Sequence, residues 1–500
     1  MQENLFKYYL FDFKILILSF LFFGKNLLAN PLLITTYPID NANDISPLLE
    51  SIELTFDRNV YVGSGNVSLK RGSDDSTVQF FDISSNNIKG NGSNKISIIL
   101  TNSLTQSQTY YFNISSLAIQ DINGNNFAGI TNTSDFNFTI SSIMPNPNDN
   151  NDLSGVIRSQ LEAAIRSIEQ SIDPIMQRIN WRKRNDRGRQ IYNSNNTEIN
   201  NYEKEFLNFI FPFKNNLSIQ FSNNFSLWTD FETSIGKIYS DNNLSKIDFD
   251  IRSVIFGADT SIDGVTAGFA LRLSNELNSI GNKGTEVYVN GYSLTFYADR
   301  KFNSGFSLSY LAGLSNLDYN SYRNINNSTI HGSRDGFQIF QALDFNGEWN
   351  YNSIFLEPYA KIYSGYTLLG SLKEDSLEYA LLVSEQKVNH RKGYIGINID
   401  KPFFTNYGFI RSNTFLELGY DFTNYSDYSL RYIEDQNTKY KKSIGSKNSY
   451  DIKLGLGIDF NLYRAWISTS YEKYLALGKK DENNPKFSSD SINLKASIKF

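Results

Sequence analysis

The side chains that most enzymes use for catalysis are scarce in this chain. Its 500 residues include no cysteine and only two histidines, His331 and His390. Because a Ser-His-Asp or Cys-His site needs a histidine beside its nucleophile, the residues before His331 cannot form one among themselves. The G-x-S-x-G pattern of a nucleophile elbow is also absent. We therefore predict a protein that is not an enzyme and uses no cofactor; a hydrolytic site around His331 and Asp335 is the alternative.

Charged side chains suggest a different role, the pairing of a helix with strands that surround it. Segment 153–181 has apolar residues at helical spacing and a basic face that carries Arg158, Arg166 and Arg178. Alternation in later segments predicts a surplus of carboxylates on one face of the strands: Asp230, Glu232, Asp248, Asp250, Glu357, Glu417, Asp451 and Asp459. We expect the two sets to attract each other in a confined space. The alternative is that the carboxylates only stay hydrated.

These carboxylates belong to segments that alternate apolar and polar residues, as strands with one apolar face do. Twelve such segments occur, at 226–236, 246–259, 265–274, 286–299, 305–316, 334–348, 353–366, 387–400, 408–423, 448–461, 465–476 and 488–500. An even number lets a barrel close with both chain ends on one side, so the further patterned piece 427–434 should be a loop or a protruding hairpin arm. Segments 318–333, 367–386 and 424–448 are predicted to be long loops.

The last of these segments ends on the final residue. Its apolar positions include Leu494, Ile498 and Phe500, and they alternate with polar residues. Many such segments, each weak alone, are typical of a transmembrane β-barrel. A soluble β-sandwich with this segment as its edge strand is the alternative.

The N-terminus predicts export from the cytoplasm. Lys7 and Lys14 precede a short apolar run, and the small residue Ala29 follows it, so we interpret 1–29 as a cleaved signal peptide. An uncleaved anchor is the alternative. The net charge of -5 gives no general attraction to nucleic acid.

Residues 30–143 contain about seven short β-patterned runs separated by turns, the density expected of a β-sandwich. The segment resembles bacterial Ig-like domains through Tyr37-Pro38, Leu54-Thr55-Phe56-Asp57, Thr109-Tyr110-Tyr111, Asp121-Ile122-Asn123-Gly124-Asn125 and Phe136-Asn137-Phe138. Asp121, Asn123 and Asn125 could ligate calcium, although a plain turn needs the same residue types. We predict no metal site.

A polar linker, 144–152, precedes the predicted helix, in which Pro174 should introduce a kink and Asp152 could act as the N-cap. A second linker, 182–225, follows it. The helix is interpreted as a plug of the barrel; a coiled-coil stalk is the alternative.

Residues 226–500 resemble the autotransporter β-domain of type V secretion. The resemblance rests on an ordered series of short motifs, among them Leu227-Trp228, Gly257-Ala258-Asp259, Leu294-Thr295-Phe296-Tyr297, Leu356-Glu357-Pro358-Tyr359 and the terminal Phe500. It implies a 12-stranded antiparallel transmembrane β-barrel whose lumen holds a pore-spanning α-helix. Together with the Ig-like β-sandwich, the predicted fold class is all-β. It also implies that the outer-membrane assembly machinery reads the terminal strand.

The expected function is that of an outer-membrane autotransporter that displays the Ig-like domain on the cell surface, for adhesion or as a spacer. Its expected partners are outer-membrane lipid, the assembly machinery and a ligand on a host or neighbouring cell. A porin-like or structural barrel with a periplasmic Ig-like domain is the alternative.

Overall fold

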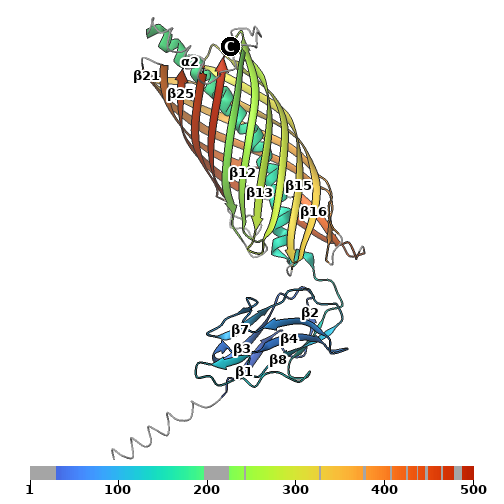
Figure 1. The fold of residues 1–500 in the computed structure, drawn as a ribbon. Helices are drawn as coiled ribbons and strands as arrows, with labels where there is room; N and C mark the ends of the chain where they lie inside the picture. The colour runs from blue at the N-terminus through green and yellow to red at the C-terminus, as the bar shows by residue number, and fades with distance from the viewer. Residues whose placement is uncertain are drawn as a thin grey trace, which may run out of the picture. The chain divides into compact units, whose positions relative to one another are not determined.

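The computed structural model describes residues 30–195, 225–240, 244–325, 328–375, 379–405, 408–423, 426–435, 437–444, 449–462, 465–477 and 487–499. The predicted signal peptide, the segment 196–224 and Phe500 lie outside these residues. The chain divides into two compact units, one that ends at Pro145 and one that contains the long helix and the barrel (Figure 1).

The first unit is a sandwich of two five-stranded sheets. The first sheet contains β1 (Leu33–Tyr37), β3 (Ser51–Val62), β6 (Ile88–Lys89), β7 (Ser93–Ile99) and β9 (Ile119–Asp121). The second contains β2 (Ala42–Ile45), β4 (Asn66–Arg71), β5 (Thr77–Asp82), β8 (Thr109–Ile114) and β10 (Asn137–Ile140). This architecture confirms the Ig-like sandwich predicted from the short alternating runs.

Alternating aromatic and aliphatic residues fill the space between the two sheets. Leu54 and Phe56 on β3 face inward together with Phe136 and Phe138, and all four are buried. The Phe56 ring meets Phe127 edge-on, with ring centroids 5.3 Å apart. The period of two along each strand thus builds one continuous apolar core.

The turn at Asp121 uses its carboxylate as a hydrogen-bond acceptor. Oδ1 accepts from the backbone N–H groups of Asn123 (2.8 Å) and Asn125 (2.9 Å), and Oδ2 accepts from the Asn125 side chain (2.9 Å). The turn requires a positive φ at Gly124, which is +81°, and glycine adopts this conformation without strain. Both carboxylate oxygens that Asp121 could offer to calcium are therefore engaged in holding the turn.

In the second unit, the 3-10 turn η1 (Pro147–Asp149) leads into the helix α2 (Asn151–Asn195). Asn150, rather than Asp152, accepts a hydrogen bond from the backbone N–H of Leu153, at 2.9 Å, as an N-cap does. The helix continues through Pro174 and beyond the predicted end at 181. No helix in the described part of the chain is long and apolar enough to cross a membrane.

The barrel is a closed antiparallel sheet of twelve long strands, which confirms the predicted fold class. They are β11 (Phe225–Ile238), β12 (Ile247–Ile262), β13 (Val265–Ile280), β14 (Thr285–Lys301), β15 (Phe306–Ile325), β16 (Ser328–Gly347), β18 (Ile354–Leu369), β21 (Gln386–Thr405), β22 (Gly408–Asp421), β25 (Ser449–Leu462), β26 (Ala465–Ala476) and β27 (Phe487–Lys499). The first and last strands pair along their length, from Ser226 opposite Lys499 to Ile238 opposite Phe487.

Five short strands lie in the connections: β17 (Trp349–Tyr351), β19 (Leu372–Glu374), β20 (Leu381–Val383), β23 (Ser426–Tyr432) and β24 (Tyr440–Ile444). β23 and β24 form a hairpin between β22 and β25, so the extra piece at 427–434 is indeed a hairpin arm. We call the end of the barrel that carries the β23–β24 hairpin the loop mouth. The opposite end, where β11 begins and β27 ends, is the turn mouth.

The prediction of a long loop at 318–333 is wrong. β15 and β16 run through it, to Ile325 and from Ser328, and each is 20 residues long. Tyr319, Ser321 and Arg323 are buried on one face, but most residues here are polar on both faces. In this segment the alternation of apolar and polar residues is therefore lost, although the strands remain paired.

Candidate functional site: the helix in the barrel lumen

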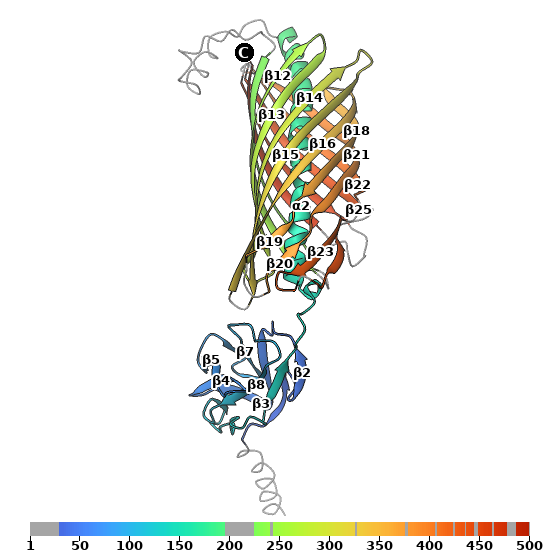
Figure 2. The same cartoon turned by 90° about the vertical axis from the view of Figure 1, so that its right-hand side faces the viewer.

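α2 runs lengthwise through the barrel (Figures 1 and 2). One face of the helix packs on lumen side chains, in a cluster made of Ile168, Ile172, Ile175, Met176 and Ile179 with Tyr297, Leu311, Phe340, Tyr363 and Tyr394 among others. Gly365 on β18 permits this close approach, because a Cβ there would lie 2.5 Å from Ile168 Cδ1. The wall and the helix are therefore matched in shape as well as in charge.

The helix begins at the loop mouth. Asp152 accepts a hydrogen bond from Ser245 at 2.5 Å, and the Lys442 ammonium on β24 donates to Ser154 Oγ at 2.8 Å. Lys442 also donates to the backbone carbonyl of Asn148, at 3.1 Å. The hairpin arm thus holds the first turn of the helix.

Two of the three predicted helix arginines bind the wall. Arg166 pairs with Glu276 and donates to Asn278 at 3.0 Å. Arg178 forms two hydrogen bonds with Asp259, at 2.9 and 3.1 Å. Arg158 instead pairs with Glu162 of the same helix, at 2.5 Å.

Near the turn mouth, basic residues that were assigned to a linker extend the helix. Arg182 also pairs with Asp259, Lys183 lies 3.1 Å from Asp299, and Arg184 lies 3.7 Å from Glu357. These ion pairs explain why the helix does not end at 181. Directly past 181, three consecutive residues thus each bring a cation against a carboxylate of the wall.

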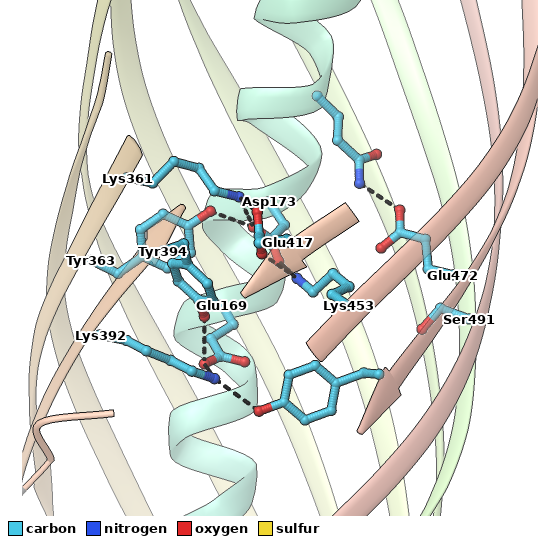
Figure 3. A network of polar contacts seen from close by, with 12 residues as sticks. Glu169, Asp173, Lys361, Tyr363, Lys392, Tyr394, Glu417, Lys453, Glu472 and Ser491 are labelled. Carbon is cyan, nitrogen blue, oxygen red and sulfur yellow. Dashed lines mark hydrogen bonds and ion pairs between the residues drawn. The ribbon is translucent and has the colours of Figure 1, made fainter. Parts of the chain in front are cut away.

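In the middle of the lumen the charges are reversed (Figure 3). Here the helix supplies the carboxylates, Glu169 and Asp173, and the wall supplies the cations. Lys392 lies 3.0 Å from Glu169, and Lys453 lies 2.5 Å from Asp173. Lys361 lies 3.7 Å from Asp173 and 2.5 Å from Glu417.

The sequence analysis missed this central cluster, which we define as Glu169, Asp173, Lys361, Lys392 and Lys453. A signal for it was present. Glu169 and Asp173 are four residues apart, so they share a helix face. The three lysines occupy the same alternation phase as Glu357, His390 and Asp451 in their strands.

Comparison with known proteins gives the family of this barrel. Residues 227–472 match the family model described as the autotransporter beta-domain. The barrel is an autotransporter β-domain. Residues 29–140 match the family model of a bacterial Ig-like domain. A search of curated proteins found no match.

Solved autotransporter structures are also similar to the chain. The translocator domain of NalP from Neisseria meningitidis has 11% identity and a TM-score of 0.45, covering 60% of this chain and 95% of that one. The β-domain of the Bordetella autotransporter BrkA has 16% identity and a TM-score of 0.40, covering 55% and 100%. The transport unit of AIDA-I from Escherichia coli has 14% identity and a TM-score of 0.34, covering 60% and 97%.

Six of the eight carboxylates predicted for the lumen of this autotransporter barrel lie on its inner wall. Asp230 pairs with Lys495 (3.4 Å), Asp451 with Lys392 (2.9 Å) and Asp459 with Arg411 (3.8 Å). Glu357 and Glu417 pair as described above. Glu232 lines a small cavity beside the helix. Of the six, Glu357 alone forms an ion pair with a helix cation whose side chain the structure describes.

Asp248 and Asp250 do not face the lumen, and this part of the prediction is wrong. On the outer face of β12, Asp248 pairs at 2.6 Å with Lys246, which directly precedes the strand, and Asp250 pairs with Arg252 at 3.0 Å. The lumen positions of this stretch are apolar and buried, namely Ile247, Phe249 and Ile251. Near the loop mouth the strand lies beyond the outer apolar belt, so polarity no longer identifies the inner face.

The helix does not fill the autotransporter lumen completely. A cavity of about 70 Å³ lies between the helix and the wall formed by β11 and β25 to β27. Its lining includes Asp173, Glu232, Lys453 and Glu472, the last of which accepts a hydrogen bond from Gln177 of the helix at 2.5 Å. The cavity is therefore polar and suited to water.

The residues predicted to form the assembly signal lie in β27 or directly after it. Leu494 is exposed on the outer face, and Ile498 is paired through the backbone with Leu227 of β11 and Ala465 of β26. Phe500 lies outside the described residues. The terminal strand therefore closes the barrel, and its recognition by the assembly machinery stays a prediction.

The two histidines contact carboxylates other than Asp335. His331 Nδ1 lies 3.2 Å from Asp375, and His390 is buried in the lumen with Nε2 3.4 Å from Glu169. Within the described ranges, no group of three or more His, Asp or Glu side chains is arranged to hold a metal ion.

Proposed function

We propose that this outer-membrane autotransporter displays its Ig-like domain on the cell surface, where the domain acts in adhesion or as a spacer. The observation that carries the proposal is the direction of α2. Its N-terminal end lies at the loop mouth, and only a short linker separates that end from the sandwich. The long loops of outer-membrane barrels face outward. The chain before the helix therefore emerges on the outside.

The charge pattern of the lumen supports a helix that stays in place. Cations of the helix meet carboxylates near both mouths, and carboxylates of the helix meet lysines between them. Sliding the helix by one turn, about 5.4 Å, would break these pairs together. The Ig-like domain would then remain tethered to the cell by the barrel.

The alternative is a structural barrel whose Ig-like domain stays in the periplasm. Protease treatment of intact cells separates the two. Surface display predicts loss of the Ig-like domain with the barrel retained and a periplasmic marker protein intact. Protection of the domain until the outer membrane is opened would refute display.

Adhesion and a spacer role differ in what the domain itself binds. Beads coated with residues 30–143 should attach to host or neighbouring cells if the domain is adhesive. A spacer would not attach, but replacing it by an unrelated sandwich of similar size would leave surface exposure of a fused epitope unchanged. The domain contains no histidine and no cysteine, which supports binding rather than catalysis.

A further inference from the structure

Two basic side chains project from the outer face of the barrel just beyond the apolar belt. Lys387 and Arg391 lie on β21 and are exposed, while the alternate residues Val388, His390 and Lys392 are buried toward the lumen. Farther along the same outer face come Ile395, which is 63% exposed, and Ile399. The two cations therefore lie at the end of the lipid-facing surface nearest the loop mouth.

Aromatic side chains mark this level as the membrane interface. Tyr366 on β18 is opposite Asn389, between the two cations, and the backbone N–H of Phe422 donates to the carbonyl of Arg391 at 2.8 Å. Both rings are exposed. Exposed Tyr and Phe form belts at the level of lipid headgroups. Lys387 and Arg391 thus lie at the level expected of lipid headgroups.

Neither cation is neutralised by a carboxylate in the described part of the chain. Two other outward cations near the loop mouth are paired, Lys473 with Asp490 at 2.6 Å and Arg252 with Asp250 at 3.0 Å. Lys387 and Arg391 form no ion pair with any residue that the structure describes. The exposed Glu385 directly precedes β21, two residues before Lys387 and farther from the apolar belt.

We propose that Lys387 and Arg391 bind the phosphate groups of a lipid in the leaflet at the loop mouth. Four residues of strand separate the two Cα atoms by about 13 Å, a span that two long side chains can close on one phosphorylated headgroup. Arginine contributes a planar fork that matches phosphate oxygens, and lysine a compact charge. The flanking Tyr366 and Phe422 rings would contact the sugar or glycerol part of the headgroup.

Native mass spectrometry of the full chain in neutral detergent tests this site. We expect the wild-type protein to retain diphosphoryl lipid A in preference to phosphatidylcholine. The double variant Lys387→Gln, Arg391→Gln should retain roughly 25-fold less, since each basic side chain near an anionic surface contributes about a factor of five. The matched control is Lys401→Gln, because Lys401 is an outward lysine near the other end of β21, over the Phe403 ring at 5.4 Å.

The outcomes are distinct. Selective loss in the double variant, with retention in Lys401→Gln, supports the site. Equal loss in both variants would show that net charge alone holds the lipid, and full displacement by inorganic phosphate would show a site for the free ion; either result overturns the proposal. Heat-modifiable gel mobility establishes that each variant is folded before the comparison is made.

Discussion

At the scale of single residues, the central cluster decides how firmly the helix is held. Asp173 lies between Lys361 and Lys453 and also accepts a hydrogen bond from the Tyr363 hydroxyl. Removing one partner of a buried ion pair leaves a charge without compensation, which costs more than the pair itself contributes.

We therefore expect Asp173→Leu to destabilise the assembled protein by about 3–5 kcal/mol. The measurement is the temperature at which the folded band disappears in heat-modifiable gel electrophoresis. The exchange Asp173→Lys with Lys453→Asp should recover part of this loss, because it restores one opposite pair. An unchanged transition in the single variant would mean that the cluster does not hold the helix.

A second residue-scale effect concerns the Asp121 turn of the Ig-like domain. Burial alone would raise the pKa of Asp121, but the hydrogen bonds from Asn125 and Asn123 outweigh it and lower the pKa below its usual value of 3.8. The ionised form is thus favoured by folding. The resulting stability is fully present above 3.8 and is lost as the pH falls through the lower, folded-state value.

Urea unfolding of residues 30–143 and of the Asp121→Asn variant should show this dependence. The wild-type domain should be more stable near neutral pH, and the difference in the free energy of unfolding should shrink as the solution is acidified below 3.8. A difference that stays constant with pH would assign the effect to packing of the turn instead.

At the scale of elements, α2 closes the lumen. Where the structure describes both helix and wall, the helix leaves a small polar cavity along β11 and β25 to β27. A barrel that lacks the helix should therefore have a continuous aqueous path lined by the charges now paired with it.

Deletion of residues 153–180 should convert a nearly closed barrel into one with clear single-channel conductance in planar bilayers. The intact protein, inserted under the same conditions, is the control. If the intact protein already conducts like an open porin, the helix does not occupy the lumen in the membrane, and the stalk interpretation gains support.

The terminal strand is the other element with a specific prediction. β27 closes the barrel against β11, and its outward positions, including Leu494, belong to the lipid-facing belt. Replacing Phe500 with Ser should lower the amount of folded barrel in the outer membrane if the assembly machinery reads this end. The same change at the outward Phe403 of β21 is the control. Unchanged levels for Phe500→Ser would refute the assembly signal.

At the scale of the whole molecule, the two units should fold independently. The sandwich has its own buried core, and its chain of about 110 residues is long enough to be stable alone. Residues 30–143 should melt cooperatively with a β-type circular dichroism spectrum. Phe56→Ala should cost about 3–5 kcal/mol, because the ring is buried against Phe127. A disordered fragment would contradict both the domain and its proposed role.

Much of this architecture is determined by the sequence alone. The twelve strands and the buried pairs Leu54 with Phe56 and Phe136 with Phe138 follow from an alternation of period two, which is a local property of each segment. The predicted closure followed from the even number of strands. Local patterns suffice here because one face of each strand meets an apolar environment, either the sandwich core or lipid.

Only the tertiary structure decided how the charges are arranged. Asp173 meets Lys361 and Lys453 from strands far away in the sequence, and no local pattern states which cation faces which carboxylate. The outward position of Asp250 and the extension of α2 past 181 have the same origin. In a polar lumen, hydrophobicity no longer separates inward from outward residues. The pairing of individual charges therefore replaces alternation as the determinant of which side chains face each other.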